Sequence, residues 1–155
     1  MPDRDHLPRL TQVWQRHPLY FITTCCAQRR KNLTTPTASP ILTNAWKAAP
    51  SLHGWFVGRY VIMPDHVHFF ARPGPNAKRL TAFLRDWKRW TSNQLVKFTG
   101  VEPPVWQPEF FDHLMRSADS YAEKWNYVRL NPVRAGLVTV PEAWPYCGEL
   151  KPLAF

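Results

Sequence analysis

The 155-residue sequence has few cysteines, few glycines and no long apolar run. Its three cysteines, Cys25, Cys26 and Cys147, form no CxxC pair, and their odd number argues against a disulfide framework. A reducing compartment is therefore the default expectation. No segment approaches the roughly 18 apolar residues of a membrane span, and the first ten residues, MPDRDHLPRL, contain no apolar signal region. Together these absences predict a cytoplasmic protein without membrane association.

The sequence is instead rich in positive charge, proline and aromatic residues. Its formal net charge is +9, and it contains 16 prolines, 8 tryptophans, 9 phenylalanines and 5 tyrosines. A positive surplus of this size suits a polyanionic partner, with nucleic acid ahead of an anionic membrane. Single-stranded nucleic acid binds to aromatic rings beside cations, because bases stack and phosphates need positive charge. The alternative to a role in nucleic-acid binding is that most of these rings form the hydrophobic core.

The hydrophobic pattern predicts an α+β domain with an antiparallel sheet. Strand-like segments cover 19–27, 54–63 and 66–72, and the last two form a hairpin about Pro64-Asp65. Helices are expected from Ser39-Pro40 to Pro50, over 78–98, and from Ser117 to Asn131, where Pro132 stops the last one. A hairpin without strand–helix alternation favours antiparallel pairing. We assign 1–18 to a polar N-terminal arm and 19–155 to one domain.

The segment YVIMPDHVHFF, residues 60–70, places two histidines one residue apart in a strand. Alternate strand residues share a face, so His66 and His68 point the same way, about 7 Å apart. Two imidazoles at this spacing can bind one metal ion if a third ligand comes from elsewhere. The alternative is two histidines on a surface strand, and the motif alone does not decide between them.

The last predicted helix carries two tyrosines on different faces. Tyr121 belongs to an apolar stripe at spacings of three and four, which is expected to face the core: Ala118, Tyr121, Ala122, Trp125 and Val128. Tyr127 lies roughly 200° around the helix from Trp125. Asn131 and Lys124 are four and three residues from Tyr127, on its face. The alternatives without a function are that Tyr127 is a half-exposed ring, Asn131 the C-terminal residue of the helix and Lys124 a solvated surface residue.

If this helix face meets the histidine strand, the parts form a catalytic site. Two imidazoles and an amide oxygen would bind a divalent ion, with Tyr127 beside it as nucleophile. A phenol, with a reference pKa near 10, is a poor nucleophile at neutral pH and needs activation. A metal would polarise a scissile phosphate and offset its developing charge.

Basic residues form a further stripe on the predicted helix 78–98, opposite its apolar side. The stripe comprises Lys78, Arg85, Lys88 and Arg89. Such a stripe can be a solvated face, but the net charge favours phosphate contact. His113 and Arg116 precede the last helix and, like Lys124, are candidate DNA contacts.

The motifs MPDHVHFF and NYVRLNPVRAGLV, in this order, with W-Q and D-H-x-x-R between them, resemble the REP-associated tyrosine transposases. These belong to the HUH single-tyrosine transposases of insertion sequences. The resemblance extends from YFITTCC to RAGLV, which is most of the chain.

The resemblance implies a ferredoxin-like sandwich, with helices packed on an antiparallel sheet, that acts on single-stranded or hairpin DNA. His66 and His68 match the family's metal-binding pair, Asn131 its third ligand and Tyr127 its nucleophile. The implied cofactor is Mg²⁺ or Mn²⁺. Cleavage would leave a 5′-phosphotyrosine link and a free 3′-OH, and reversal would rejoin strands near hairpin (REP-like) sequences.

Two departures and two rival functions accompany this interpretation. Asp65 stands where many relatives have asparagine, and Pro108-Glu109 replaces the basic residue common after W-Q. One rival is a domesticated protein that binds hairpins without cleaving them. The other is a structural zinc protein, which the scattered cysteines disfavour. A monomer and a homodimer, with the tyrosine acting in cis or in trans, both remain open.

Overall fold

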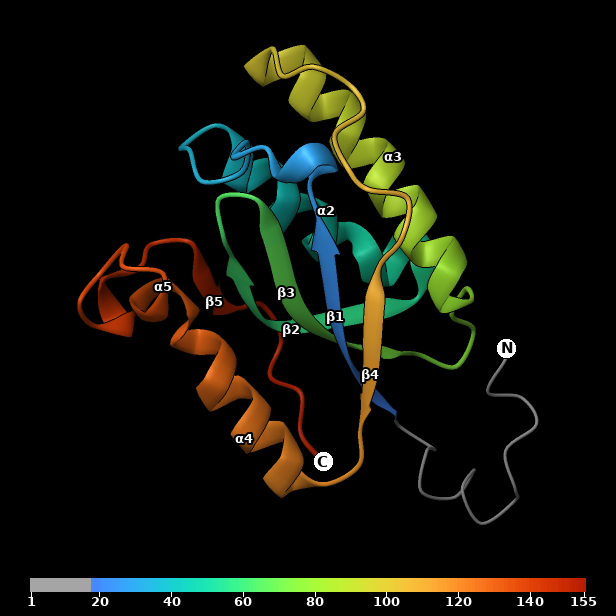
Figure 1. The fold of residues 1–155 in the computed structure, drawn as a ribbon. Helices are drawn as coiled ribbons and strands as arrows, with labels where there is room; N and C mark the ends of the chain where they lie inside the picture. Colours follow the sequence, from blue (N-terminus) through green and yellow to red (C-terminus); the bar gives the residue numbers. More distant parts are fainter. Residues whose placement is uncertain (1–17) are drawn as a thin grey trace.

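The computed structural model describes residues 18–155, which build one five-stranded sheet with helices on both of its faces (Figure 1). The predicted arm, residues 1–18, lies outside this part of the chain except for Pro18. The helices and strands, in chain order, are β1 (Leu19–Cys25), α2 (Ala38–His53), β2 (Trp55–Ile62), β3 (His66–Pro73), α3 (Leu80–Thr99), β4 (Phe111–Met115), α4 (Ala118–Arg129), α5 (Asn131–Arg134) and β5 (Cys147–Glu149).

The sheet has the strand order β4-β1-β3-β2-β5, and all of its pairings are antiparallel. From β1 to β4 the elements follow the order βαββαβ, which is the ferredoxin-like arrangement. The predicted α+β fold with an antiparallel sheet is therefore confirmed. Because β3 is the central strand, it presents its side chains to the middle of each sheet face.

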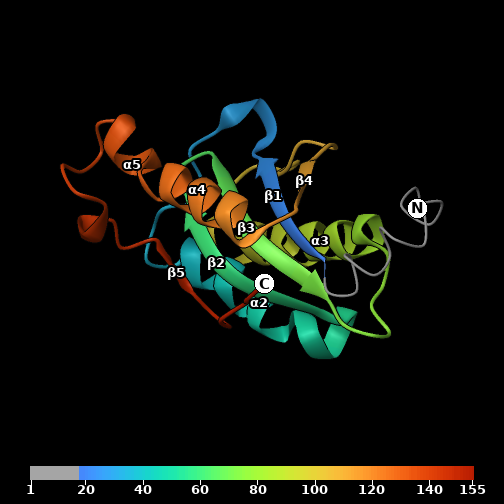
Figure 2. The same ribbon diagram turned by 90° about the horizontal axis from the view of Figure 1, so that it is seen from below.

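The two faces of the sheet are covered differently, as Figure 2 shows, with α4 on one side of the strands and α2 on the other. Ile22, Val67 and Phe69 belong to the larger core, together with buried residues of α2 and α3. There Trp46 of α2 stacks on Trp87 of α3, with ring centroids 5.4 Å apart. Phe70 belongs to the opposite face, where a smaller core forms against α4. Burial of these apolar surfaces is the main force that holds the three layers together.

Several element boundaries differ from the sequence-based prediction. Helix α2 continues past Pro50 to His53. Proline lacks only its own N–H bond there, and the helix ends three residues later at His53, where the N–H of the following Gly54 bonds the Pro50 carbonyl at 3.1 Å. Gly54 has φ +77°, the left-handed conformation that glycine adopts without strain. Strands β4 and β5 were not predicted, because their sequences lack a run of alternating apolar residues.

The last helix is also shorter than predicted. Ser117 caps it as expected, accepting a hydrogen bond from the Ser120 N–H at 3.0 Å. However, α4 ends at Arg129, and Pro132 lies in the first turn of the short α5 instead of terminating a longer helix. Of the predicted apolar stripe, Tyr121 and Val128 are buried, whereas Ala118 and Ala122 are exposed.

Among residues 18–155, no helix is both long enough and apolar enough to cross a membrane.

Candidate active site

His66 and His68 lie on the face of the sheet that α4 partly covers. In the β1–β3 register Thr23 is opposite His68 and Cys25 is opposite His66. Phe21 stacks on His68 with ring centroids 5.3 Å apart. The two imidazole rings are 4.8 Å apart and nearly perpendicular. The strand therefore brings both rings together at one point on this face, as the H-x-H spacing predicts.

Hydrogen bonds fix one nitrogen of each ring. The Nδ1 of His66 is 2.8 Å from Asp65 Oδ1, and the Nδ1 of His68 is 2.8 Å from Thr23 Oγ1. A carboxylate on Nδ1 selects the tautomer whose lone pair is on Nε2, which is the arrangement usual for metal-binding histidines. The Nε2 of His66 is thus available for a metal, and the Nε2 of His68 is the nitrogen that its contact with Thr23 leaves open. Arg29 holds Asp65 in place beside His66, because its Nε donates to Asp65 Oδ2 at 3.0 Å.

The electrostatics keep His68 neutral. Burial, as the largest cause, and the nearby charges of His66, Lys124, Arg134 and Arg29 together lower the pKa of His68 to about 3. A neutral imidazole is the form that binds metals. Burial would raise the pKa of Asp65, but hydrogen bonds from His66 and Arg29 hold it below its usual value. Asp65 is therefore a carboxylate.

Helix α4 exposes Tyr127 and buries Tyr121. Tyr121 is 7% exposed and its ring packs edge-on against Phe70, at 4.8 Å. Tyr127 is 63% exposed. The guanidinium of Arg134 lies 3.8 Å from the centre of the Tyr127 ring. The structure thus puts the two tyrosines on different faces, and it leaves the phenol of Tyr127 accessible.

Asn131 follows the end of α4 as the first residue of α5. Its Oδ1 accepts a hydrogen bond from Arg134 Nη2 at 3.0 Å. Arg134 therefore contacts both Tyr127 and Asn131, and it is close enough to His68 for its charge to lower the pKa of that ring. Val128 of α4 packs against Val61 and Met63 on the histidine face, so the predicted nucleophile lies on a helix of that side and the predicted third ligand follows the end of this helix.

Two imidazoles and an amide oxygen, as His66, His68 and Asn131 would supply, suit a divalent ion with open positions. No group of three His, Cys, Asp or Glu side chains able to hold a metal occurs within residues 18–155. A closed site of the zinc-finger kind is therefore absent from this part of the chain. Two imidazoles with an amide oxygen leave room for water and phosphate oxygens. Oxygen and imidazole donors together suit Mn²⁺, and an oxygen-rich completion suits Mg²⁺.

A cavity of about 380 Å³ lies between β4 and α4, next to the tyrosine. Three of the predicted DNA contacts, His113, Arg116 and Lys124, line it together with Tyr127. Lys124 is half-buried, with its ammonium 5.2 Å from the centre of the Phe21 ring. Lys124 and Tyr127 line the same cavity, in keeping with their predicted position on one face of the helix, and the Lys124 side chain also reaches Phe21 of the sheet.

The chain is similar in sequence to curated proteins of two bacteria. It is 27% identical to a Haemophilus influenzae protein assigned as a REP-associated tyrosine transposase, with 83% of this chain and 77% of that protein covered. It is 25% identical to the REP-associated tyrosine transposase of Escherichia coli K12, with 82% and 73% covered. The chain is a homologue of REP-associated tyrosine transposases. No protein-family model matches it.

Solved structures of similar proteins share the fold. One is a REP-associated tyrosine transposase bound to a REP hairpin, with a TM-score of 0.66 and 23% identity, covering 84% of this chain and 75% of that one. Another is a Deinococcus radiodurans protein assigned as a transposase, with a TM-score of 0.57 and 17% identity, covering 72% and 88%. The similarity to these two structures thus lies in the fold, in the architecture of the sheet and its helices.

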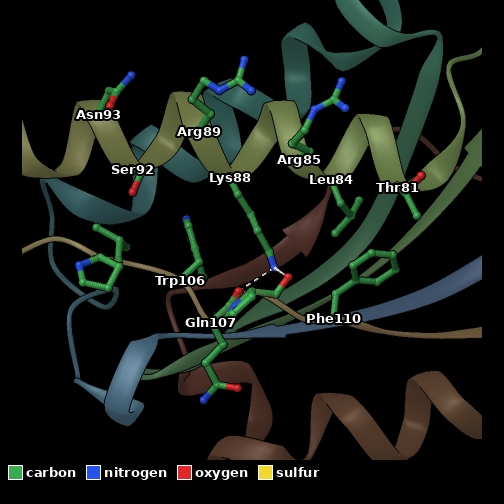
Figure 3. A pocket seen from close by; sticks show the side chains of 13 residues that line it. Thr81, Leu84, Arg85, Lys88, Arg89, Ser92, Asn93, Trp106, Gln107 and Phe110 are labelled. Carbon is green, nitrogen blue, oxygen red and sulfur yellow. Dashed lines mark hydrogen bonds between the residues drawn. The ribbon is translucent and has the colours of Figure 1, made fainter.

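The predicted basic stripe lies on the other side of the molecule, along a groove of about 580 Å³ between α3 and residues 104–110 (Figure 3). Arg85 and Arg89 are exposed there, and both lie within 4 Å of the single carboxylate of Asp86. Lys78 also bonds Asp86, at 3.0 Å. This carboxylate offsets part of the positive charge that the sequence pattern suggests.

Lys88 has a different environment from the other cations of the stripe. Its Nζ donates to the backbone carbonyls of Gln107, Pro108 and Glu109, at 2.8, 3.3 and 2.7 Å. The dashed lines in Figure 3 mark hydrogen bonds from Lys88 to this loop. An ammonium has three donors, and all three have protein partners here. Lys88 thus anchors the loop before β4.

Sequence reasoning missed Arg134 and Thr23. Arg134 lies three residues after Asn131, and one helical turn brings such residues together, so the NPVR segment carried a usable signal. Thr23 carried none, because its position opposite His68 depends on the register between two strands 45 residues apart.

Proposed function

We propose that this protein cleaves and rejoins single-stranded DNA beside hairpin sequences, with Tyr127 as the nucleophile and a divalent metal held by His66, His68 and Asn131. One observation carries the proposal. Two imidazoles have their Nδ1 atoms occupied and face the same side of the sheet as an exposed phenol and an asparagine, which Arg134 joins. The homologues named above are tyrosine transposases, and a structural relative binds a REP hairpin.

The residues of the site would divide the reaction among them. The Tyr127 oxygen attacks the phosphorus, the bond from phosphorus to the 3′ oxygen breaks, and a 5′-phosphotyrosine and a free 3′-OH result. Because Tyr127 is exposed, solvent can take the phenol proton and return one to the leaving oxygen. A bound metal ion would polarise the phosphate. Arg134 and Lys124 supply positive charge where negative charge develops on the phosphate oxygens.

Storage of the phosphodiester energy in the tyrosine link explains how the strands could be rejoined. The free 3′-OH of the same or another strand attacks the phosphotyrosine, and the phenol leaves. The reaction needs no external energy source, because one phosphodiester bond is exchanged for another.

Metal-dependent cleavage by histidine variants tests the proposal. With Mn²⁺ and labelled single-stranded DNA that contains a hairpin, the wild-type protein should give a fragment whose 3′-OH a polymerase can extend. His66→Ala and His68→Ala should lower the rate at least about 100-fold, because a metal supplies several kcal/mol of stabilisation to such a transition state. His53→Ala, at the end of α2, is the matched control and should cleave normally.

Two outcomes would contradict the proposal. Cleavage that resists a chelator, or that survives His68→Ala, would remove the metal from the mechanism. Tight hairpin binding without any cleavage by the wild-type protein would support the rival function, a protein that binds hairpins only.

A further inference from the structure

Strand β4 displays an unusually exposed aromatic residue, Phe111, on the histidine face of the sheet. Phe111 is 68% exposed, more than any other large hydrophobic residue of the described chain. One exposed apolar side chain needs no functional explanation by itself. For Phe111, the position relative to the histidine site, the adjoining cavity and the surrounding charge together support a functional explanation.

The strand register places Phe111 in line with the histidine site. Thr23 pairs with Phe111 on one side and with His68 on the other, and paired residues of an antiparallel sheet point to the same face. Thr23 also bonds the His68 ring. Two strand spacings separate the backbones of Phe111 and His68, which is roughly 10 Å. The phenylalanine ring and the histidine pair therefore stand on one continuous surface.

His113, the next residue of β4 on the same face, connects this surface to the cavity beside Tyr127. His113 is opposite Phe21, the residue that stacks on His68. His113 also lines the cavity that contains Tyr127 and the cations Arg116 and Lys124, and Glu123 is the one acidic side chain in its lining. Phe111 thus lies two residues along β4 from a cavity whose lining contains two cations and one carboxylate.

We propose that Phe111 is the stacking platform for a base of the single-stranded DNA near the scissile phosphate. This inference rests on the proposed function and adds a positioning residue to it. Single-stranded nucleic acid is held by aromatic faces that stack its bases and cations that meet its phosphates, and this face offers both. A base on Phe111 would hold the strand along β4, beside the histidine pair and the cavity that Tyr127 lines.

The test measures DNA binding in a Tyr127→Phe background, where cleavage cannot interfere. The probe is a single-stranded oligonucleotide with 2-aminopurine at successive positions, whose fluorescence falls when the base stacks on a ring. We expect quenching at one position or two adjacent positions. Phe111→Ala should abolish that quenching and weaken binding about tenfold, the size typical for loss of one stacked base. Phe111→Trp should restore both.

Two controls separate a local effect from misfolding. Phe98→Ala removes another exposed ring, 57% exposed, from the far end of α3, and should change neither quenching nor affinity. Phe111→Trp keeps a β-forming aromatic at the position, so its recovery of binding shows that the alanine variant lost a stacking surface and not the strand.

The outcomes distinguish this inference from the proposed function. Phe111→Ala that binds and quenches like its parent, while the wild-type protein cleaves DNA, overturns the platform and leaves the function standing. Quenching that depends on Phe111, with no cleavage by the wild-type protein, supports the platform and overturns the chemistry. Failure of the parent protein to bind the oligonucleotide overturns both.

Discussion

Asp65 orients His66, and its two hydrogen bonds explain how. It accepts from His66 Nδ1 on one oxygen and from Arg29 Nε on the other. A carboxylate behind a metal-binding imidazole fixes the ring and raises its basicity. An asparagine at this position would offer an amide oxygen that can accept the His66 bond but carries no charge.

We predict that Asp65→Ala weakens Mn²⁺ binding about 10- to 100-fold, the usual cost of losing such a partner. Asp65→Asn should weaken it less, because the acceptor remains. Isothermal titration with Mn²⁺ measures both, and Asp119→Ala, at the exposed start of α4, is the matched control. An Asp65→Ala protein that binds Mn²⁺ as tightly as the wild type would show that the histidines need no such support.

The residues of the candidate site differ in how well the sequence predicts them. The H-x-H spacing and the helical offset between Tyr121 and Tyr127 depend on local geometry, so strand and helix periods suffice. The partners of these residues depend on long-range register. Thr23 meets His68, and Phe111 joins their row, only because β1 pairs with both β3 and β4. No local pattern contains that information.

The same contrast holds at the scale of helices and strands. The central hairpin and α3 have strong periodic patterns and were predicted to within about two residues, a normal boundary error. Strand β4 has only two buried residues, Leu114 and Met115, and three exposed ones, so its pairing with β1 outweighs its weak sequence pattern. Two helix boundaries that the prediction places at prolines are wrong. Pro50 lies in the last turn of α2, and Pro132 opens a new turn.

We predict that Lys88→Ala destabilises the protein by about 2 kcal/mol, because it leaves three carbonyls of the loop before β4 without their shared donor. Arg85→Ala, three residues earlier and exposed, should change the free energy of unfolding by less than about 0.5 kcal/mol. Its effect should be on DNA binding instead, with a flatter salt dependence. Urea denaturation measures the stability of both variants. Equal stability of the two would contradict the anchoring role of Lys88.

At the scale of the whole molecule, fold and charge support the same account. The net charge of +9 suits a polyanion, and cations lie on both faces of the sheet, around the tyrosine cavity and along α3. The α+β sandwich provides one well-covered face, which carries most of the core, and one partly open face. The histidines, Tyr127 and Phe111 all belong to the open face, which is where the proposed DNA strand would bind.

The central claim is that Tyr127 forms a covalent bond with DNA. The most direct test incubates the protein with Mn²⁺ and labelled single-stranded DNA from the flanks of its own gene, followed by a denaturing gel. The account predicts a shifted protein–DNA band for the wild-type protein and for Tyr121→Phe, and none for Tyr127→Phe. A band that persists in Tyr127→Phe, or tight DNA binding with no band in any protein, would contradict it.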